Sequence, residues 1–391
     1  MAGLRVALVH PYSWPEVRRG GERLLHDLAW YLASAGHSVE VLTGAWSGPS
    51  VETTPEGAVI RRHQLREMAP VQRRFRVGPM ETFGAWALAD LARRRYDVVH
   101  ALTPTGALAG RLSGHRTVYT VLGHPDPEDF ALQPGSRRLF RAAVRAAHVT
   151  TALSTSAAER VRQLGGRAAR VLPPGVRTDR FTPELEPRTG PVRVVFASDA
   201  SDVRKGVHHA LAAMRVVRRR HPDARLVLCG PGDAAWAVQG VGADASAVLA
   251  RVDPLAVRGL GPDGAELLAE ATTRLEGVTP EQMPELYRSG TVTVLPSWHE
   301  AFGLTLAESL ACGTPVACFS EAGMTDVVDD PGVGRMAAFG DEDGLARAVC
   351  QAVELARRPG TPARCVEHAR QWGWKESVGP AYLELYRSLS R

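Results

Sequence analysis

The sequence predicts an α/β protein built from two Rossmann-like, doubly wound domains that face a cleft. Two observations lead to this class. The chain has 391 residues, and at about 150 residues per domain this length is typical of two domains. Short apolar runs also alternate with helical patterns in both halves, as in parallel sheets covered by helices. Residues 180–191 hold three prolines and no apolar periodicity, so they are the best linker candidate between the halves.

The first half opens with a strand–helix–strand unit. Residues 5–10 are a short apolar run typical of a buried strand. Residues 22–35 place leucines at helical spacing, Gly36 ends that helix, and the alternation over residues 38–43 predicts a second strand. Further strands are expected near Val59, Val98, Val118 and Val171.

The same pattern restarts after the proline-rich segment. Residues 192–198 predict a strand and residues 206–220 a helix. Residues 233–280 are glycine-rich, and their elements cannot be assigned from the pattern. Later strands are expected at 224–229, 291–297 and 314–319, with a helix at 304–312. Ligands of such sheets bind at the carboxyl ends of the strands.

Composition excludes several classes of protein. The chain is 45% hydrophobic and 23% charged, as in folded soluble proteins. No apolar run is long enough to span a membrane, and no signal peptide is evident, so a cytoplasmic protein is expected. The net charge is +5, but basic residues are interspersed with acidic ones, which argues against nucleic-acid binding. Five cysteines without a C-x-x-C pair predict free buried thiols and no zinc site.

The most informative segment begins where a strand ends near Pro296. Glu300 follows in the loop, and Phe302, Gly303 and Leu304 stand at the start of a helix. Free amides at a helix start attract anions. Gly303 would let a ligand approach the backbone closely.

Glu308 lies on that helix among apolar neighbours. A buried carboxylate needs a partner, and either a ligand or an internal salt bridge or hydrogen bond would serve. Eight residues of helix span about 12 Å, more than the roughly 5–9.5 Å between the carboxyls of a glycosidase pair. We therefore expect Glu300 and Glu308 to contact different parts of one extended ligand.

Residues 300–308 resemble the Glu-x₇-Glu motif of the family-4 retaining glycosyltransferases, which have the GT-B fold. The resemblance extends over nearly the whole chain, from residues 20–43 with the Gly20-Gly21 pair to residues 372–389, which resemble the family's terminal helix. It implies an acceptor-binding domain at 1–187, a nucleotide-sugar-binding domain at 188–373, and a terminal helix at 374–391 that packs on the first domain.

The resemblance also implies roles for single residues in the second domain. Glu308 would bind the donor ribose hydroxyls, and Glu300 would lie beside the donor sugar. The amides of Phe302, Gly303 and Leu304 would meet sugar hydroxyls or phosphate.

Basic groups and glycines complete the implied donor site. Arg204 and Lys205 would neutralise the leaving diphosphate, and Gly20 and Gly21 would let the first-domain backbone approach it. Without the family context, the basic pair is a solvated turn and the two glycines are a simple turn at a helix start.

The sequence departs from the family at two positions. Ser198 stands where an arginine usually follows a glycine, so Arg204 would have to replace that arginine. Leu122 stands where the family often has a histidine that contacts the donor sugar. Either His124 would serve from a shifted position, or the donor sugar would lack the group that this histidine binds, in which case His124 is structural or merely exposed. His10 and His100, both at strand ends, are weaker candidates.

These observations predict a retaining, hexosyltransferase-like enzyme that moves a sugar from a nucleotide-diphosphate sugar to an acceptor hydroxyl. No Asp-x-Asp metal motif occurs, and no cofactor or metal is expected. Alternatives are a GT-B nucleotide-sugar epimerase or phosphorylase, a noncatalytic sugar-nucleotide binder, and a Rossmann oxidoreductase. The last is disfavoured because Gly230-Pro231-Gly232 lacks the third glycine of a dinucleotide fingerprint.

The acceptor is not identified by any motif. A basic helix expected at 135–148 could touch an anionic membrane as a peripheral contact, as in lipid-acceptor members of the family, although a solvated helix is the simpler interpretation. A small-molecule natural product is therefore the preferred acceptor class, with a glycolipid or cell-envelope acceptor as the alternative. Donor identity and oligomeric state are not predicted.

Overall fold

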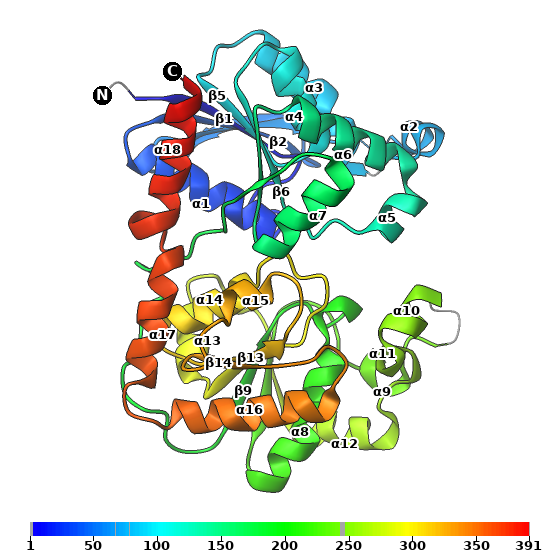
Figure 1. Cartoon of the computed structure of the whole chain (residues 1–391), viewed down its shortest axis with the longest axis vertical. Coiled ribbons are helices and arrows are strands. Elements are labelled where there is room, and N and C mark those ends of the chain that lie inside the picture. The colour runs from blue at the N-terminus through cyan, green and yellow to red at the C-terminus, as the bar shows by residue number, and fades with distance from the viewer. Residues whose placement is uncertain (1–2, 67, 78, 243–246, 391) are drawn as a thin grey trace. The chain divides into compact units, whose positions relative to one another are not determined.

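The computed structural model describes residues 3–66, 68–77, 79–242 and 247–390. The chain divides into two compact units (Figure 1). Unit 1 contains the residues up to Gly175 together with those from Trp374 onward, and unit 2 is Val176–Gly373. The division falls before the expected boundary at residue 187, because the intervening residues bond to unit 2: the Glu184 amide donates to Cys312 O, and the Arg288 guanidinium to Thr182 O.

Unit 1 is built on a sheet of order β3-β4-β2-β1-β5-β6-β7-β8. All neighbouring strands pair in parallel except β3 and β4. The strands are β1 (Arg5–Val9), β2 (Ser38–Ala45), β3 (Ser50–Thr53), β4 (Val59–Gln64), β5 (Val98–Ala101), β6 (Thr117–Val121), β7 (Val149–Ala152) and β8 (Arg170–Val171).

Helices and turns connect these strands. They are α1 (Gly20–Ser34), α2 (Ala69–Phe75), the 3₁₀ turn η1 (Pro79–Phe83), α3 (Gly84–Ala92), α4 (Pro104–Leu112), α5 (Pro127–Leu132), α6 (Pro134–Ala146), α7 (Thr155–Gly165), a π turn (Trp374–Val378) and α18 (Gly379–Ser390). The first strand–helix–strand unit forms as expected. The leucines of α1 are buried, and Gly36 follows the helix with the positive φ of 82° that favours glycine.

The terminal segment completes the core of unit 1. Tyr382 and Tyr386 of α18 are fully buried. Tyr386 Oη lies 2.6 Å from Nδ1 of His100 on β5. At the start of the segment, Trp374 packs so closely on Gly175 that a side chain there would collide with its ring. Residues at the end of the chain therefore pack into the unit formed by its first half.

Unit 2 is built on a fully parallel sheet of order β11-β10-β9-β12-β13-β14. The strands are β9 (Arg193–Ala197), β10 (Arg225–Cys229), β11 (Thr272–Leu275), β12 (Val292–Leu295), β13 (Val316–Phe319) and β14 (Gly334–Ala337). The chain proceeds outward from β9 to β11 and then returns to β12 on the other side of β9. The topological switch point, where such sheets bind ligands, is thus between β9 and β12.

The helices of unit 2 include those within residues 233–280 that could not be assigned from the sequence pattern. They are the 3₁₀ turn η2 (Val203–Lys205), α8 (Val207–Arg220), α9 (Trp236–Gln239), α10 (Ala247–Val252), α11 (Pro254–Arg258), α12 (Gly261–Glu270), α13 (Met283–Ser289), α14 (Leu304–Ala311), α15 (Met324–Val327), α16 (Glu342–Ala356), α17 (Thr361–Ala369) and the 3₁₀ turn η3 (Arg370–Trp372). Within 233–280, α9, α10 and α11 have only four to six residues, and β11 is a partly exposed edge strand. An edge strand lacks the continuous apolar run of a buried parallel strand.

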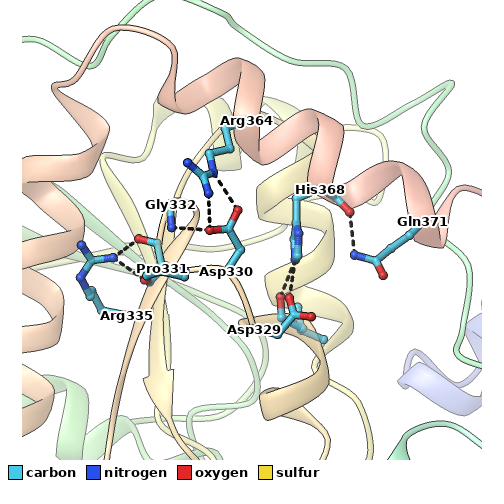
Figure 2. A network of polar contacts seen from close by, with 10 residues as sticks. Asp329, Asp330, Pro331, Gly332, Arg335, Arg364, His368 and Gln371 are labelled. Carbon is cyan, nitrogen blue, oxygen red and sulfur yellow. Dashed lines mark hydrogen bonds and ion pairs between the residues drawn. The ribbon is translucent and has the colours of Figure 1, made fainter.

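A polar network braces the amino end of β14 (Figure 2). Arg364 of α17 donates two hydrogen bonds to Asp330, both 2.7 Å long, and this pairing holds the pKa of the Asp330 carboxyl below its usual value. His368, one turn later, lies 3.1 Å from Val327 O. The network ties α17 to the loop before β14, at the opposite end of the strand from the carboxyl edge, which indicates a role in stability.

No helix in the described part of the chain is both long and apolar enough to cross a membrane. The five cysteines are buried free thiols, as the sequence predicts.

Candidate functional site

The Lys205 turn is held against the carboxyl end of β12. Asp202 caps η2 by accepting a hydrogen bond from the Arg204 amide. Gly206 follows with a φ of 74°, and a side chain at this position would collide with Pro296 O. The Trp298 amide donates to Arg204 O at 3.0 Å. Glycine at 206 therefore allows two segments distant in sequence to meet at the switch point.

Lys205 and Glu300 form an ion pair at this meeting point. Lys205 Nζ lies 2.6 Å from Glu300 Oε2, and the two side chains keep 26% and 19% of their surface exposed. The structure thus brings together two predicted site residues and leaves both within reach of a ligand. A partly exposed pair of this kind is suited to exchange partners when an anion enters.

Arg204 takes a different direction from Lys205. Its guanidinium pairs with Asp202 of the same turn, with Nη2 2.6 Å from Oδ2, and its side chain is 54% exposed. The diphosphate role expected for Arg204 would require this local pair to open. Lys205 also has a carboxylate partner, but that partner is Glu300, so Lys205 is the cation that lies beside another residue of the predicted donor site.

The loop that carries Glu300 is backbone-packed against the loop after β13. His299 and Ala322 adopt positive φ values of 54° and 46°, a conformation that non-glycine residues adopt mainly where the surrounding structure imposes it. The Gly323 amide donates to Glu300 O at 2.9 Å. Both loops are thus held in defined positions beside the helix start.

The start of α14 offers backbone amides without a side-chain cap. Its N-cap is Gly303, with a φ of 99°. Leu304 is partly exposed, whereas the Phe302 ring is buried with its edge against Trp372, 5.7 Å between centroids. The Phe302 ring is therefore not available to a ligand. The anion-attracting helix start expected from the sequence is present.

Glu308 lies one turn into α14 and is 4% exposed. Tyr287 of α13 donates a hydrogen bond to its Oε2 at 3.1 Å. The buried carboxylate therefore has an internal partner, as the structural interpretation of this residue predicted. Its ribose-binding role stays a prediction.

A glycine turn after β10 packs against the backbone of the loop after β9. Gly230 has a φ of 141°, and a side chain there would collide with Ser198 O. The Ala200 amide donates to Pro231 O, and Trp236 Nε1 donates to Ala200 O at 2.7 Å. The loop that carries Ser198 is therefore held by the glycine turn and by Trp236, which the sequence patterns did not single out.

A second polar group missed by the sequence patterns lies just beyond the Lys205 turn. His208 and His209 of α8 both contact Oδ2 of Asp253, at 2.8 and 3.2 Å, and all three side chains are buried. Asp253 Oδ1 accepts from the Ala256 amide and caps α11. Hydrogen bonding within the protein thus accounts for both carboxylate oxygens, which indicates a packing role.

Unit 1 places Gly20 and Gly21 at the start of α1, whose N-cap residue makes no side-chain cap. A Cβ on Gly21 would lie 2.7 Å from Cδ1 of Leu122. A Cβ there would have to displace the end of the side chain of Leu122, the residue that stands where the family often has a histidine.

The three histidines considered from the sequence have protein partners. His124 Nε2 lies 2.8 Å from Ser156 Oγ at the start of α7. His10 is buried against Tyr12, and burial lowers its pKa to about 4. His100 is fully buried between Thr120 and Tyr386, with a pKa lowered to about 3 by burial. His100 is thus a core residue that does not reach the surface.

Two parallel-sheet α/β domains of this kind define the GT-B class of glycosyltransferases. Sucrose-phosphate synthase from Thermosynechococcus elongatus has the same fold, with a TM-score of 0.77 at 22% identity over 99% of both chains. Anabaena HepE, in complex with UDP and glucose, superposes with a TM-score of 0.67 at 19% identity over 99% of both chains.

Comparison of sequences leads to the family. Residues 18–180 match Glycosyltransferase Family 4, and residues 191–354 match Glycosyl transferases group 1. D-inositol 3-phosphate glycosyltransferase from Acidothermus cellulolyticus is 28% identical over 92% of this chain and 84% of its own length. The chain belongs to the family-4 retaining glycosyltransferases.

Proposed function

We propose that this glycosyltransferase moves a sugar from a nucleotide-diphosphate sugar to a hydroxyl of a small-molecule natural product, with retention of anomeric configuration. The observation that carries the proposal is the partly exposed Lys205–Glu300 pair at the switch point of unit 2. It lies beside the uncapped start of α14, the helix that also holds Glu308. A cation, free amides and a buried carboxylate are the groups that a diphosphate, a sugar and a ribose require.

In the proposed reaction Lys205 exchanges Glu300 for the diphosphate of the donor. The bond between the sugar and the β-phosphate oxygen breaks while the acceptor oxygen bonds to the same face of the sugar. The acceptor proton passes to the leaving phosphate oxygen, so no separate base is needed. Lys205 stabilises the negative charge that grows on the diphosphate in the transition state.

The donor is best identified by a thermal-shift screen of UDP, ADP and GDP, each with its common sugars. We expect one nucleoside diphosphate to raise the unfolding temperature of the protein, because binding to the native state alone stabilises it. The HepE complex with UDP and glucose makes UDP the first nucleotide to test. No shift with any nucleotide, together with no transfer, would contradict the proposal.

We also propose that the reaction needs no metal and takes place in the cytoplasm. Five buried free thiols support a reducing compartment. Transfer rates measured with and without a chelator should agree, and loss of activity that added metal restores would refute metal independence.

The basic helix α6 is not an amphipathic helix that inserts into a membrane. Arg137, Arg138 and Arg141 are exposed, but Phe140 and Val144 on the other face belong to the core of unit 1. The apolar face of α6 is therefore not available for insertion into a bilayer.

Incubating the protein with donor alone tests the epimerase alternative, because an epimerase would convert the donor sugar without any acceptor.

A further inference from the structure

Unit 1 contains a cavity of about 300 Å³ at the carboxyl ends of β1, β2 and β4. The residues that line it follow these strands or belong to α2 and η1. Its volume is at the lower end of the roughly 300–1,000 Å³ typical of small-molecule sites. No residue of the donor site in unit 2 contributes to its lining.

The cavity is formed by three strand ends that are hydrogen-bonded to one another. The Gly44 amide donates to Pro11 O at 3.0 Å, and the Leu65 amide donates to Ala45 O at 2.9 Å. The Gln64 side chain donates to Trp46 O at 3.0 Å. A Cβ on Gly44 would collide with Leu65 Cδ2 and lie 3.0 Å from Pro11 O, so a larger residue would have to displace the Leu65 side chain that lines the cavity. The cavity is thus a built feature of the sheet edge.

Aromatic and aliphatic groups dominate the lining. The residues Tyr12, Trp46 and Phe83 contribute rings, and Pro11 and Leu65 contribute aliphatic surface. Trp46 keeps 57% of its surface exposed although it is a large apolar residue. An exposed tryptophan at the wall of a cavity is suited to stack on a planar ligand.

Polar groups in the lining favour an anionic or hydrogen-bond-accepting substituent. Arg66 and Gln72 supply donors, and Arg66 is exposed. Among the described residues that line the cavity there is no carboxylate to accept hydrogen bonds from a set of sugar hydroxyls. The lining thus fits an apolar ring that carries an acid group better than it fits a free sugar.

We propose that this cavity binds the acceptor and selects a planar aromatic compound that carries an anionic group. The inference deepens the proposed function and rests on it for the identity of the ligand as acceptor. Trp46 stacks on the ring, and Arg66 pairs with the acid group. These two residues then determine acceptor specificity, whereas the donor binds to residues of unit 2.

The test uses the full-length protein and two probes of nearly equal shape. 3-Hydroxy-2-naphthoate carries a carboxylate and a phenolic hydroxyl, and 2-naphthol carries the hydroxyl alone. Titration calorimetry should show binding of both, with the naphthoate tighter. Trp46→Ala should weaken both probes roughly tenfold, from lost ring contact. Arg66→Gln should weaken only the naphthoate, because it removes only the cation.

Trp86→Ala is the matched control, since Trp86 is an exposed tryptophan of unit 1 that stacks on His63 and does not line the cavity. It should leave both affinities unchanged. Unchanged affinities of both probes in Trp46→Ala and Arg66→Gln would overturn the proposal. A free hexose that binds more tightly than the naphthoate and displaces it would overturn the proposal as well.

The failure of this inference can be told apart from the failure of the proposed function. The nucleotide-induced thermal shift should persist in Trp46→Ala and Arg66→Gln, because it reports only the donor site. Transfer to some other acceptor without naphthoate binding would overturn the cavity assignment and leave the glycosyltransferase proposal standing. Naphthoate binding without transfer from any nucleotide sugar would support the cavity and count against the proposed reaction.

Discussion

Lys205 and Arg204 are adjacent in sequence but differ in what their charges face. Lys205 points to Glu300, and Arg204 is held by Asp202 in its own turn. Lys205 is therefore the cation proposed to meet the leaving diphosphate, and Arg204 is the cation that stabilises the turn. We expect substitution of Lys205 to affect transfer more than substitution of Arg204.

Lys205→Ala should lower kcat roughly 100-fold, because it removes a cation that stabilises charge in the transition state. Arg204→Ala should lower kcat less than about tenfold, since its guanidinium pairs within its own turn and not with a residue of the predicted donor site. Steady-state kinetics with saturating acceptor would measure both. If Lys205→Ala changes only the KM for the donor, the lysine binds the donor but does not give extra stabilisation to the transition state.

Glu308→Gln should weaken the binding of the free nucleoside diphosphate by about 1–3 kcal/mol, the usual cost of losing a charged hydrogen-bond partner. The fold should survive, because glutamine keeps an acceptor for Tyr287. Glu354→Gln, at an exposed position on α16, is the control. Equal nucleotide affinities of wild type and Glu308→Gln in calorimetry would exclude the ribose role.

Glu81 lies in η1 directly before two residues that line the acceptor cavity, and burial raises its pKa to about 7. In the folded protein Glu81 keeps its proton up to about pH 7, whereas in the unfolded chain it loses the proton above about pH 4.5. The free energy of unfolding therefore falls as the pH rises from about 4.5 to about 7. Glu81→Gln should therefore gain stability relative to wild type between these pH values.

Urea unfolding at pH 4.5, 6 and 8 measures this difference. Glu384→Gln, at an exposed position on α18, should show no such trend. A stability difference between Glu81→Gln and wild type that stays constant with pH would contradict the assignment of a raised pKa.

At the carboxyl edge of the unit 2 sheet, neighbouring loops contact one another through backbone atoms at glycine positions. Gly206 lets the Lys205 turn touch the end of β12, and Gly230 lets the turn after β10 touch the loop after β9. Such contacts position α8 and α14 at the same edge. A helix start can then present amides and a lysine to one ligand.

Gly206→Ala should lower the free energy of unfolding of unit 2 by about 2 kcal/mol or more, and it should reduce transfer because Lys205 is displaced. The substitution combines a left-handed backbone with a collision against Pro296. Gly190→Ala separates the two effects, because Gly190 has a φ of 92° with open space around it. Equal losses of stability would show that the contact with Pro296 is unimportant.

Across the whole molecule, the chain order and the compact units do not coincide. Unit 1 is assembled from the first 175 residues and the segment after Gly373. The contact between His100 and Tyr386 joins residues 286 positions apart. The terminal segment is therefore a structural part of unit 1.

Tyr386→Phe should destabilise unit 1 by about 1–3 kcal/mol, because Nδ1 of buried His100 loses its partner. Ser388→Ala on the same helix is the control, since Ser388 is exposed and its hydroxyl bonds only to Leu385 O. Denaturant unfolding followed by far-ultraviolet circular dichroism measures both. Equal midpoints for the two variants would mean that α18 contributes little through this bond.

The sequence by itself determined the fold class, most strands, the helix start at Gly303 and the family, and it located the helices α1, α6, α8, α14 and α18. These features are encoded in short windows, because hydrophobic periodicity, glycine positions and the Glu-x₇-Glu spacing depend on near neighbours. The helices within 233–280 and the edge strand β11 were not predicted, because the helices α9, α10 and α11 are too short for a periodic pattern and β11 is partly exposed. The helix α16 was not assigned either.

Only the tertiary structure decided which side chains meet. The Lys205–Glu300 pair, the direction of Arg204, the core position of His100 and the cavity beside Trp46 all depend on residues far apart in the chain. The unit boundary after Gly175 does as well, since residues 176–187 belong to unit 2 through contacts such as that of Thr182 with Arg288. Local patterns specify a residue's element and face, whereas its partners follow only when packing brings distant elements to the same place.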